Sequence, residues 1–133
     1  MKNALIGAGL AVAAMTGSAA AEEVLGKQEY MVACAICHGE SGKGNGPFAP
    51  VLNIETPSLT NLAAKNDGTF PFLETLMIID GRTGVRGHDG GSMPIWGDRY
   101  SKSATELAGV YGSEAIVRGR LLSLVYYLES IQE

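Results

Sequence analysis

The chain is poor in the side chains that most often bind metals through nitrogen or sulfur. Its 133 residues include only two cysteines and two histidines. A closed zinc site of four such ligands would need all of them, including His88, which lies far from the others in the sequence. A purely structural zinc site is therefore disfavoured, and the two cysteines call for another explanation.

Positive charge is also scarce. Ten Lys and Arg face fourteen Asp and Glu, which gives a formal net charge of −4. An acidic chain of this kind is not expected to bind nucleic acid or an anionic membrane surface, and it favours a partner with a basic docking patch. The charge excludes partners, but it says nothing about the fold.

The sequence has no long hydrophobic run apart from one at its beginning. Lys2 and the apolar stretch from Ala4 to Met15, followed by Ala19-Ala20-Ala21, have the pattern of a secretory signal peptide. The stretch is too short to span a bilayer comfortably, which takes about 20 apolar residues. We expect residues 1–21 to be cleaved near Ala21 and residues 22–133 to form one domain without a permanent membrane anchor. An uncleaved anchor is the alternative.

Strand patterns are missing as well, and helical ones alternate with glycine-rich loops. The sequence predicts helices at 24–36, from Thr56 or Ser58 to 65, at 71–80, briefly from a capping box at 103–106, and at 113–130. The last has apolar residues at Val117, Leu121, Leu124 and Leu128, as one buried helical face requires. Residues 39–53 and 81–100 are expected to be loops. The predicted fold class is all-α, with three to five helices.

The run Cys34-Ala-Ile-Cys37-His38 is the most informative part of the chain. Two thiols three positions apart lie on one side of a helical turn and can reach both vinyl groups of one porphyrin, and the following histidine can bind the iron. A thioredoxin-like redox pair is the main rival, but it would be expected in a βαβ setting. The motif therefore predicts one haem c, held by two thioether bonds with His38 as an axial ligand. Export fits this prediction, because c-type haem is attached outside the bacterial inner membrane.

The second axial ligand has four candidates after residue 21: Met31, Met77, His88 and Met93. Met31 precedes Cys34 on the same helix and cannot reach the opposite haem face, and Met77 lies on an apolar helix face, where it is expected to fill the core. Met93 lies in a glycine-rich loop, and Pro94 biases its backbone toward an extended conformation. We expect Met93 to bind the iron, with His88 as the alternative.

Ligation by His38 and Met93 would decide what the haem can do. A thioether favours Fe(II) and raises the reduction potential. With both axial positions filled, oxygen and small substrates find no vacant site on the iron. The sequence therefore predicts an electron-transfer protein rather than an enzyme.

With these residues in place, the chain resembles the class I cytochromes c. Gly26 and Tyr30 precede Cys34 at the family's spacing, and Leu124-Val-Tyr-Tyr127-Leu128 resembles the segment that crosses them. The resemblance implies the cytochrome c fold, with loops wrapped around one haem and the last helix crossing the first at Gly26. It also implies a proline carbonyl that accepts a hydrogen bond from His38, for which Pro50 is expected and Pro47 is the rival.

Other residues near Met93 are candidates for contact with the haem. Trp96 is expected either to donate its indole N–H to a haem propionate or to form a wall of the pocket. The arginines of the same region could pair with propionates; these are Arg82, Arg86 and Arg99. For His88, a surface position is expected unless it binds the iron.

Together these features predict a soluble, monomeric electron carrier of the periplasm that exchanges single electrons with larger redox proteins. The first alternative is a dedicated cytochrome c subunit of a periplasmic dehydrogenase or oxidase. The second is a haem sensor or haem enzyme with an open sixth position on the iron. The donor, the acceptor and the reduction potential are not evident from the sequence.

Overall fold

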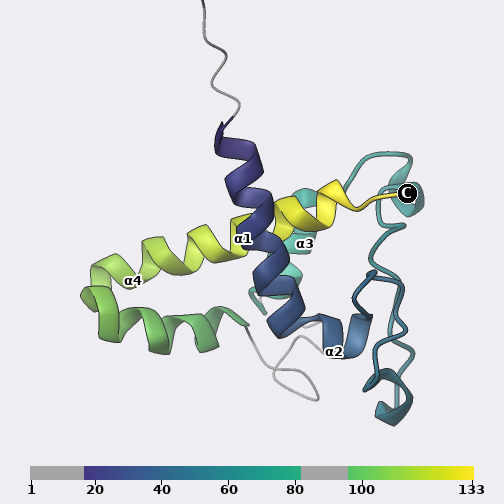
Figure 1. Ribbon diagram of the computed structural model, residues 1–133, viewed down its shortest axis with the longest axis horizontal. Helices are drawn as coiled ribbons and strands as arrows, with labels where there is room; N and C mark the ends of the chain where they lie inside the picture. Colours follow the sequence, from purple (N-terminus) through teal and green to yellow (C-terminus); the bar gives the residue numbers. More distant parts are fainter. Residues whose placement is uncertain (1–16, 82–95) are drawn as a thin grey trace, which may run out of the picture.

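The chain folds into helices connected by loops (Figure 1). The computed structural model describes the backbone of residues 17–81 and 96–133, and the side chains of residues 23–81, 104–109 and 111–133. The elements are α1 (Gly17–Ala33), α2 (Ala35–His38), η1 (Ala49–Val51), η2 (Ala64–Asn66), α3 (Phe72–Ile79) and α4 (Trp96–Ser130), where η marks a 3₁₀ helix. No strand occurs in these ranges, so the all-α prediction is confirmed.

Helices α1 and α4 cross, and their contact is the most extensive in the fold (Figure 1). At the crossing, a Cβ added to Gly26 would lie 2.7 Å from the Cβ of Tyr127 and would overlap the backbone carbonyl of Ser123. Only glycine lets the two helices approach this closely. The crossing predicted at Gly26 is confirmed.

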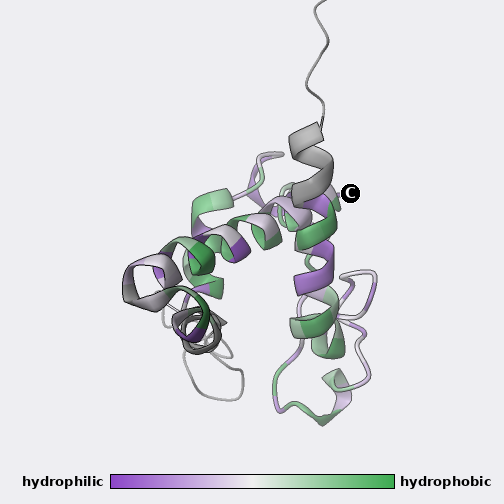
Figure 2. Cartoon of the chain, turned by 60° about the vertical axis from the view of Figure 1, so that its left-hand side comes forward, coloured by the Kyte–Doolittle hydropathy of each residue, from purple (hydrophilic) through white to green (hydrophobic). Residues whose placement is uncertain are grey.

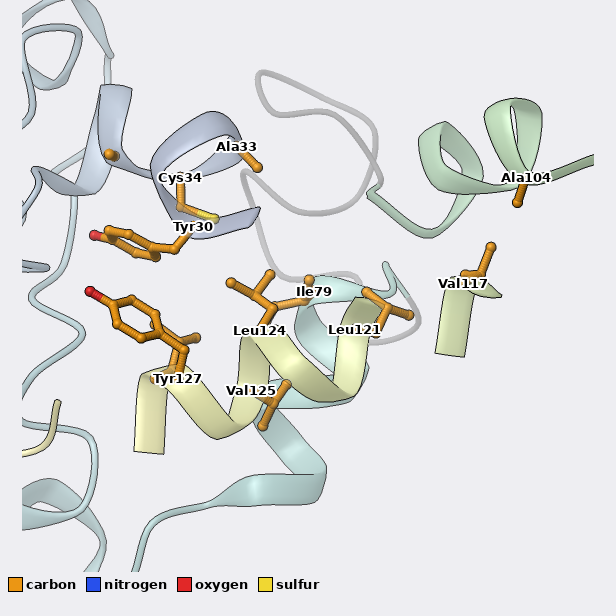
Figure 3. Packing of buried hydrophobic residues seen from close by; sticks show 12 residues of the cluster. Tyr30, Ala33, Cys34, Ile79, Ala104, Val117, Leu121, Leu124, Val125 and Tyr127 are labelled. Atoms are coloured by element: carbon orange, nitrogen blue, oxygen red, sulfur yellow. The ribbon is translucent and has the colours of Figure 1, made fainter. Parts of the chain in front are cut away.

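The buried side of α4 follows the predicted stripe. Val117, Leu121, Leu124 and Leu128 are all buried, and Figure 3 shows the first three pointing toward the same cluster. Tyr30 of α1 and Ile79 of α3 belong to this core. Figure 2 shows apolar and polar residues interspersed along the second limb of α4, as expected for a helix with one buried face.

The prediction for the region before Ser113 is wrong in its boundaries. The structure has two helical limbs here, as predicted, but they meet directly at Gly109, where φ is 67° and ψ is −178°, and together they form α4. Ser103 cannot cap a helix that has already begun at Trp96, and Ser113 lies buried within the second limb. The first limb folds back, and its Ala104 is completely buried near Val117 (Figure 3).

Of the two shorter helices predicted in the middle of the chain, one is confirmed. Helix α3 begins directly after Pro71 and ends before Gly81, as expected. Its Met77 remains 37% exposed, so it does not fill the core as predicted. The helix expected to end at Lys65 is wrong: the segment forms turns and then η2, because several of its backbone groups bind residues far away in the sequence.

The beginning of α1 overlaps the predicted leader. The helix starts at Gly17, four residues before the expected cleavage point at Ala21. Cleavage there stays a prediction. Within the described ranges, every helix is too short or too polar to cross a bilayer.

Candidate functional site

The site begins where α1 gives way to α2. Cys34 separates the two helices with φ −114° and ψ −35°, and its amide still donates to the Tyr30 carbonyl at 2.8 Å. Its own carbonyl accepts from the amides of Cys37 at 3.1 Å and His38 at 2.9 Å. The five-residue motif is therefore one helical turn, in which the two cysteines, three positions apart, lie on the same side.

Tyr30 fixes this turn to α1. Its side chain is fully buried, and its hydroxyl donates to the Gly39 carbonyl, just after the motif, at 2.6 Å. Its ring lies 5.3 Å from the Tyr127 ring, centroid to centroid, on the crossing helix (Figure 3). Burial raises the pKa of Tyr30, which therefore stays a neutral hydrogen-bond donor.

His38 is held in a single orientation. Only 5% of its surface is exposed, and its Nδ1 donates to the carbonyl oxygen of Pro57 at 3.1 Å. Donation from Nδ1 selects the tautomer in which Nε2 carries the lone pair that a metal ligand needs. Burial also lowers the pKa of His38, which favours the neutral imidazole.

The expected acceptor, Pro50, is wrong, and the course of the loop explains why. After the motif, the chain turns and runs back along it. Three backbone hydrogen bonds record this course, from the amides of Gly44, Gly46 and Phe48 to the carbonyls of His38, Cys37 and Ile36, at 2.8, 3.0 and 2.9 Å. Both Pro47 and Pro50 are thereby carried past His38 toward the other end of the motif.

The chain then returns and brings Pro57 to His38. The Leu59 amide donates to the Gly42 carbonyl at 2.7 Å, and Thr56 and Pro57 pack against Gly44. The sequence did hold a signal for Pro57, because Pro50-Val51-Leu52 and Pro57-Ser58-Leu59 share the proline-x-leucine pattern of the family's acceptor proline. Choosing between the two prolines required the path of the loop.

The geometry disfavours the redox-pair interpretation of the cysteines. Both thiols are free. Burial raises the pKa of Cys34 to about 12 and also raises the pKa of Cys37. Catalytic redox cysteines have lowered pKa values in electropositive surroundings. The described residues also contain no group of three or more His, Cys, Asp or Glu side chains that could hold a metal ion.

The remaining predicted site residues cannot be placed against the motif. Met93, His88, Arg82 and Arg86 lie outside the described residues. Trp96 is the first residue of α4 and Arg99 lies in its first limb, but their side chains are also outside the described set. Their predicted roles stay predictions.

Comparison with protein families now adds to this geometry. The family model described as Cytochrome c matches residues 23–106, well over half of the chain. The chain belongs to the cytochrome c family. Comparisons with curated proteins and with solved structures return no match. The helical architecture is accordingly a cytochrome c fold, and membership implies covalently bound haem c and haem-based electron transfer.

The described residues of this cytochrome fit such a group. Three apolar residues are exposed here: Ile36 within the motif, and Phe48 and Val51 on the returning loop, whose Phe48 amide donates to the Ile36 carbonyl. A flat apolar group bound against them would shield them from water. In the loop near Pro57, two buried polar atoms, Thr56 Oγ1 and Asn61 Oδ1, lack a hydrogen-bond partner among the described residues. Such atoms call for a bound group or water. Two thiols and an oriented imidazole complete a donor set suited to haem c.

Proposed function

We propose that this cytochrome is a soluble, monomeric electron carrier of the periplasm with a single haem c. Cys34 and Cys37 would hold the porphyrin, and His38 and Met93 would bind the iron from opposite faces. When bound, the haem supplies a one-electron redox centre, while the protein supplies orientation and electrostatics.

The observation that carries the proposal is the hydrogen bond from His38 Nδ1 to the Pro57 carbonyl. Histidines that bind metals almost always donate their other ring nitrogen in this way, which fixes the ring and raises its basicity. The motif alone would allow a rotating histidine. An oriented, buried one suits a permanent axial ligand.

Two observations support Met93 as the second iron ligand: its place within the matched residues, and the positions of the other methionines. Met93 falls within the matched residues 23–106. Met31 lies on α1, the helix that leads into the motif, and Met77 lies within α3. Ligation by His38 and Met93 would raise the reduction potential and leave no vacant position, so the protein would carry electrons rather than catalyse a reaction.

The partners we propose are larger redox proteins with basic docking surfaces. The chain has fourteen acidic and ten basic residues, and its negative net charge would favour such surfaces. The leader-like residues 1–21 support export to the periplasm. A free carrier is expected to remain monomeric after mild extraction, whereas stable co-purification with a catalytic chain would make it a dehydrogenase or oxidase subunit.

The test of the iron ligands is the absorption spectrum of the haem-loaded wild type, Met93→Ala and Met77→Ala. The weak far-red band of Met–Fe(III) ligation should disappear in Met93→Ala and persist in Met77→Ala. The reduction potential of Met93→Ala should fall by at least about 59 mV, which for one electron is a tenfold change in the equilibrium constant for reduction. Persistence of the band in Met93→Ala contradicts the assignment.

Carbon monoxide separates the carrier from a sensor or an enzyme. The reduced wild type should bind the gas slowly or not at all at neutral pH, because both axial positions are filled. Met93→Ala should bind it rapidly. Rapid binding by the wild type would indicate an open sixth position. A negative pyridine haemochrome test would show that the protein carries no covalently attached haem.

A further inference from the structure

A second set of contacts holds the proximal side of the site, and it comes from the two residues that follow Ile131. The loop between Pro57 and Ala63 lacks regular helical hydrogen bonds, so its backbone groups need other partners. Several of these partners belong to Gln132 and Glu133, which lie outside residues 23–106.

Gln132 uses both ends of its side-chain amide on backbone groups. Its Nε2 donates to the carbonyl of Leu59 at 2.8 Å and to the carbonyl of Leu128 at 2.7 Å. Its Oε1 accepts from the Ala63 amide at 2.9 Å. An amide has two donors and one carbonyl oxygen, and here each donor and the oxygen has a backbone partner.

Glu133 holds the same loop from the neighbouring position. Its amide donates to the Thr60 carbonyl at 2.8 Å, and Thr60 is itself buried. Its carboxylate lies 2.8 Å from Lys43 Nζ, in the loop that follows the motif. Residues 132 and 133 thus bind two consecutive carbonyls, those of Leu59 and Thr60, two and three residues after Pro57.

Because Gln132 also binds Leu128, α4 supports both residues of the hydrogen bond between His38 and Pro57. Helix α4 crosses α1 at Gly26 and thereby places the motif that carries His38. Through Gln132, the same helix places the loop that carries Pro57. The Leu59–Gly42 bond and the bond from the Glu133 amide to Thr60 also hold this loop, so removing Gln132 would loosen it between these points without releasing it.

We propose that Gln132 is a positioning residue for the proximal haem ligand, keeping the Pro57 carbonyl within hydrogen-bond distance of His38 Nδ1. A firm bond at Nδ1 makes the imidazole a stronger electron donor and so favours Fe(III). Gln132 therefore lowers the reduction potential. The inference depends on the proposed function only in taking His38 as an iron ligand.

The test uses the haem-loaded protein and two variants, Gln132→Met and Gln132→Ala. Methionine keeps the length of the side chain without its hydrogen bonds, and alanine admits water to the same backbone groups. Asn66→Leu is the matched control, because Asn66 Nδ2 also donates to a backbone carbonyl, that of Thr69, at 2.8 Å on an exposed turn.

Both Gln132 variants should be easier to reduce than the wild type. The equilibrium constant for their reduction by a reference couple should rise about threefold, which corresponds to a potential about 30 mV higher, because a tenfold change corresponds to about 59 mV. In the Fe(II) protein, the His38 Nδ1 proton should exchange with deuterium about tenfold faster by NMR. Asn66→Leu should change neither quantity. Unchanged potential and exchange in the Gln132 variants, or equal changes in the control, overturn the proposal.

A measurement on the wild type is independent of how well the variants fold. If Gln132 holds the loop, its opening exposes both the Ala63 amide and the Nδ1 proton, and the two should show similar protection once each exchange rate is divided by the intrinsic rate of its own group. An Ala63 amide that is protected more than about tenfold less than Nδ1 overturns the inference. Neither readout involves Met93 or a redox partner, so failure here leaves the proposed function standing.

Discussion

At Gly26, a single missing methyl group decides how close two helices come. The Ser123 carbonyl and the Tyr127 Cβ occupy the space that a side chain would need. Tyr30, one turn further along α1, can then bury its ring against Tyr127 and bind Gly39. The position of the haem motif therefore depends on a residue eight positions before its first cysteine.

Gly26→Ala should destabilise the haem-loaded protein by about 3 kcal/mol, because the nearest obstacle is backbone that cannot rotate away. Gly119→Ala is the control, since a Cβ at Gly119 meets nothing within 4 Å. That substitution should be neutral or stabilise α4 by up to about 1 kcal/mol. Denaturant unfolding of both variants measures the difference, and equal stabilities would contradict the packing argument.

Among the elements, α4 contributes most to the architecture. Its second limb supplies half of the buried apolar residues that the structure describes, and its first limb folds back at Gly109 so that Ala104 is buried. With φ at 67° and ψ at −178°, Gly109 adopts a backbone conformation that residues with a Cβ rarely adopt. The first limb begins three residues after Met93 in the sequence, so the proposed iron ligand is joined to this limb by a short stretch of chain.

Gly109→Ala should cost about 1–3 kcal/mol of stability, or drive the two limbs toward one straight helix. Space is not the reason, because a Cβ there meets nothing within 4 Å. Either result should weaken ligation by Met93, and the far-red band should lose intensity. Gly119→Ala, in regular helix, should keep the full band. An unaltered band and unaltered stability in Gly109→Ala would show that the bend is not required.

On the scale of the whole molecule, charge should govern how the protein meets its partners. The formal net charge is −4. Exposed charges act at a distance of about 30 Å at 0.01 M salt but only about 8 Å at 0.15 M. Added salt should therefore weaken attraction to a positive surface and relieve repulsion from a negative one.

Electron exchange with small inorganic complexes isolates this effect. Between 0.01 M and 0.15 M salt, the rate with a cationic complex should fall severalfold, and the rate with an anionic complex should rise. Stopped-flow absorbance of the haem measures both. Rates that change in the same direction for the two reagents would contradict an exchange governed by the negative net charge.

Local patterns by themselves determined the haem motif, the all-α class and the buried stripe of α4. In each case the signal is a spacing of three or four residues, which a helix turns directly into a shared face. The start of α3 after Pro71 also followed from a local signal, whereas the close approach at Gly26 was implied by the resemblance to the class I cytochromes c. Only the tertiary structure decided that Pro57, rather than Pro50, meets His38. The choice of proline depends on the path of a loop, and the loop contacts of Gln132 join residues more than 60 positions apart, and helical spacing carries no information about either. The tertiary structure also revealed the bend at Gly109, where one glycine leaves the helical conformation inside an otherwise helical pattern.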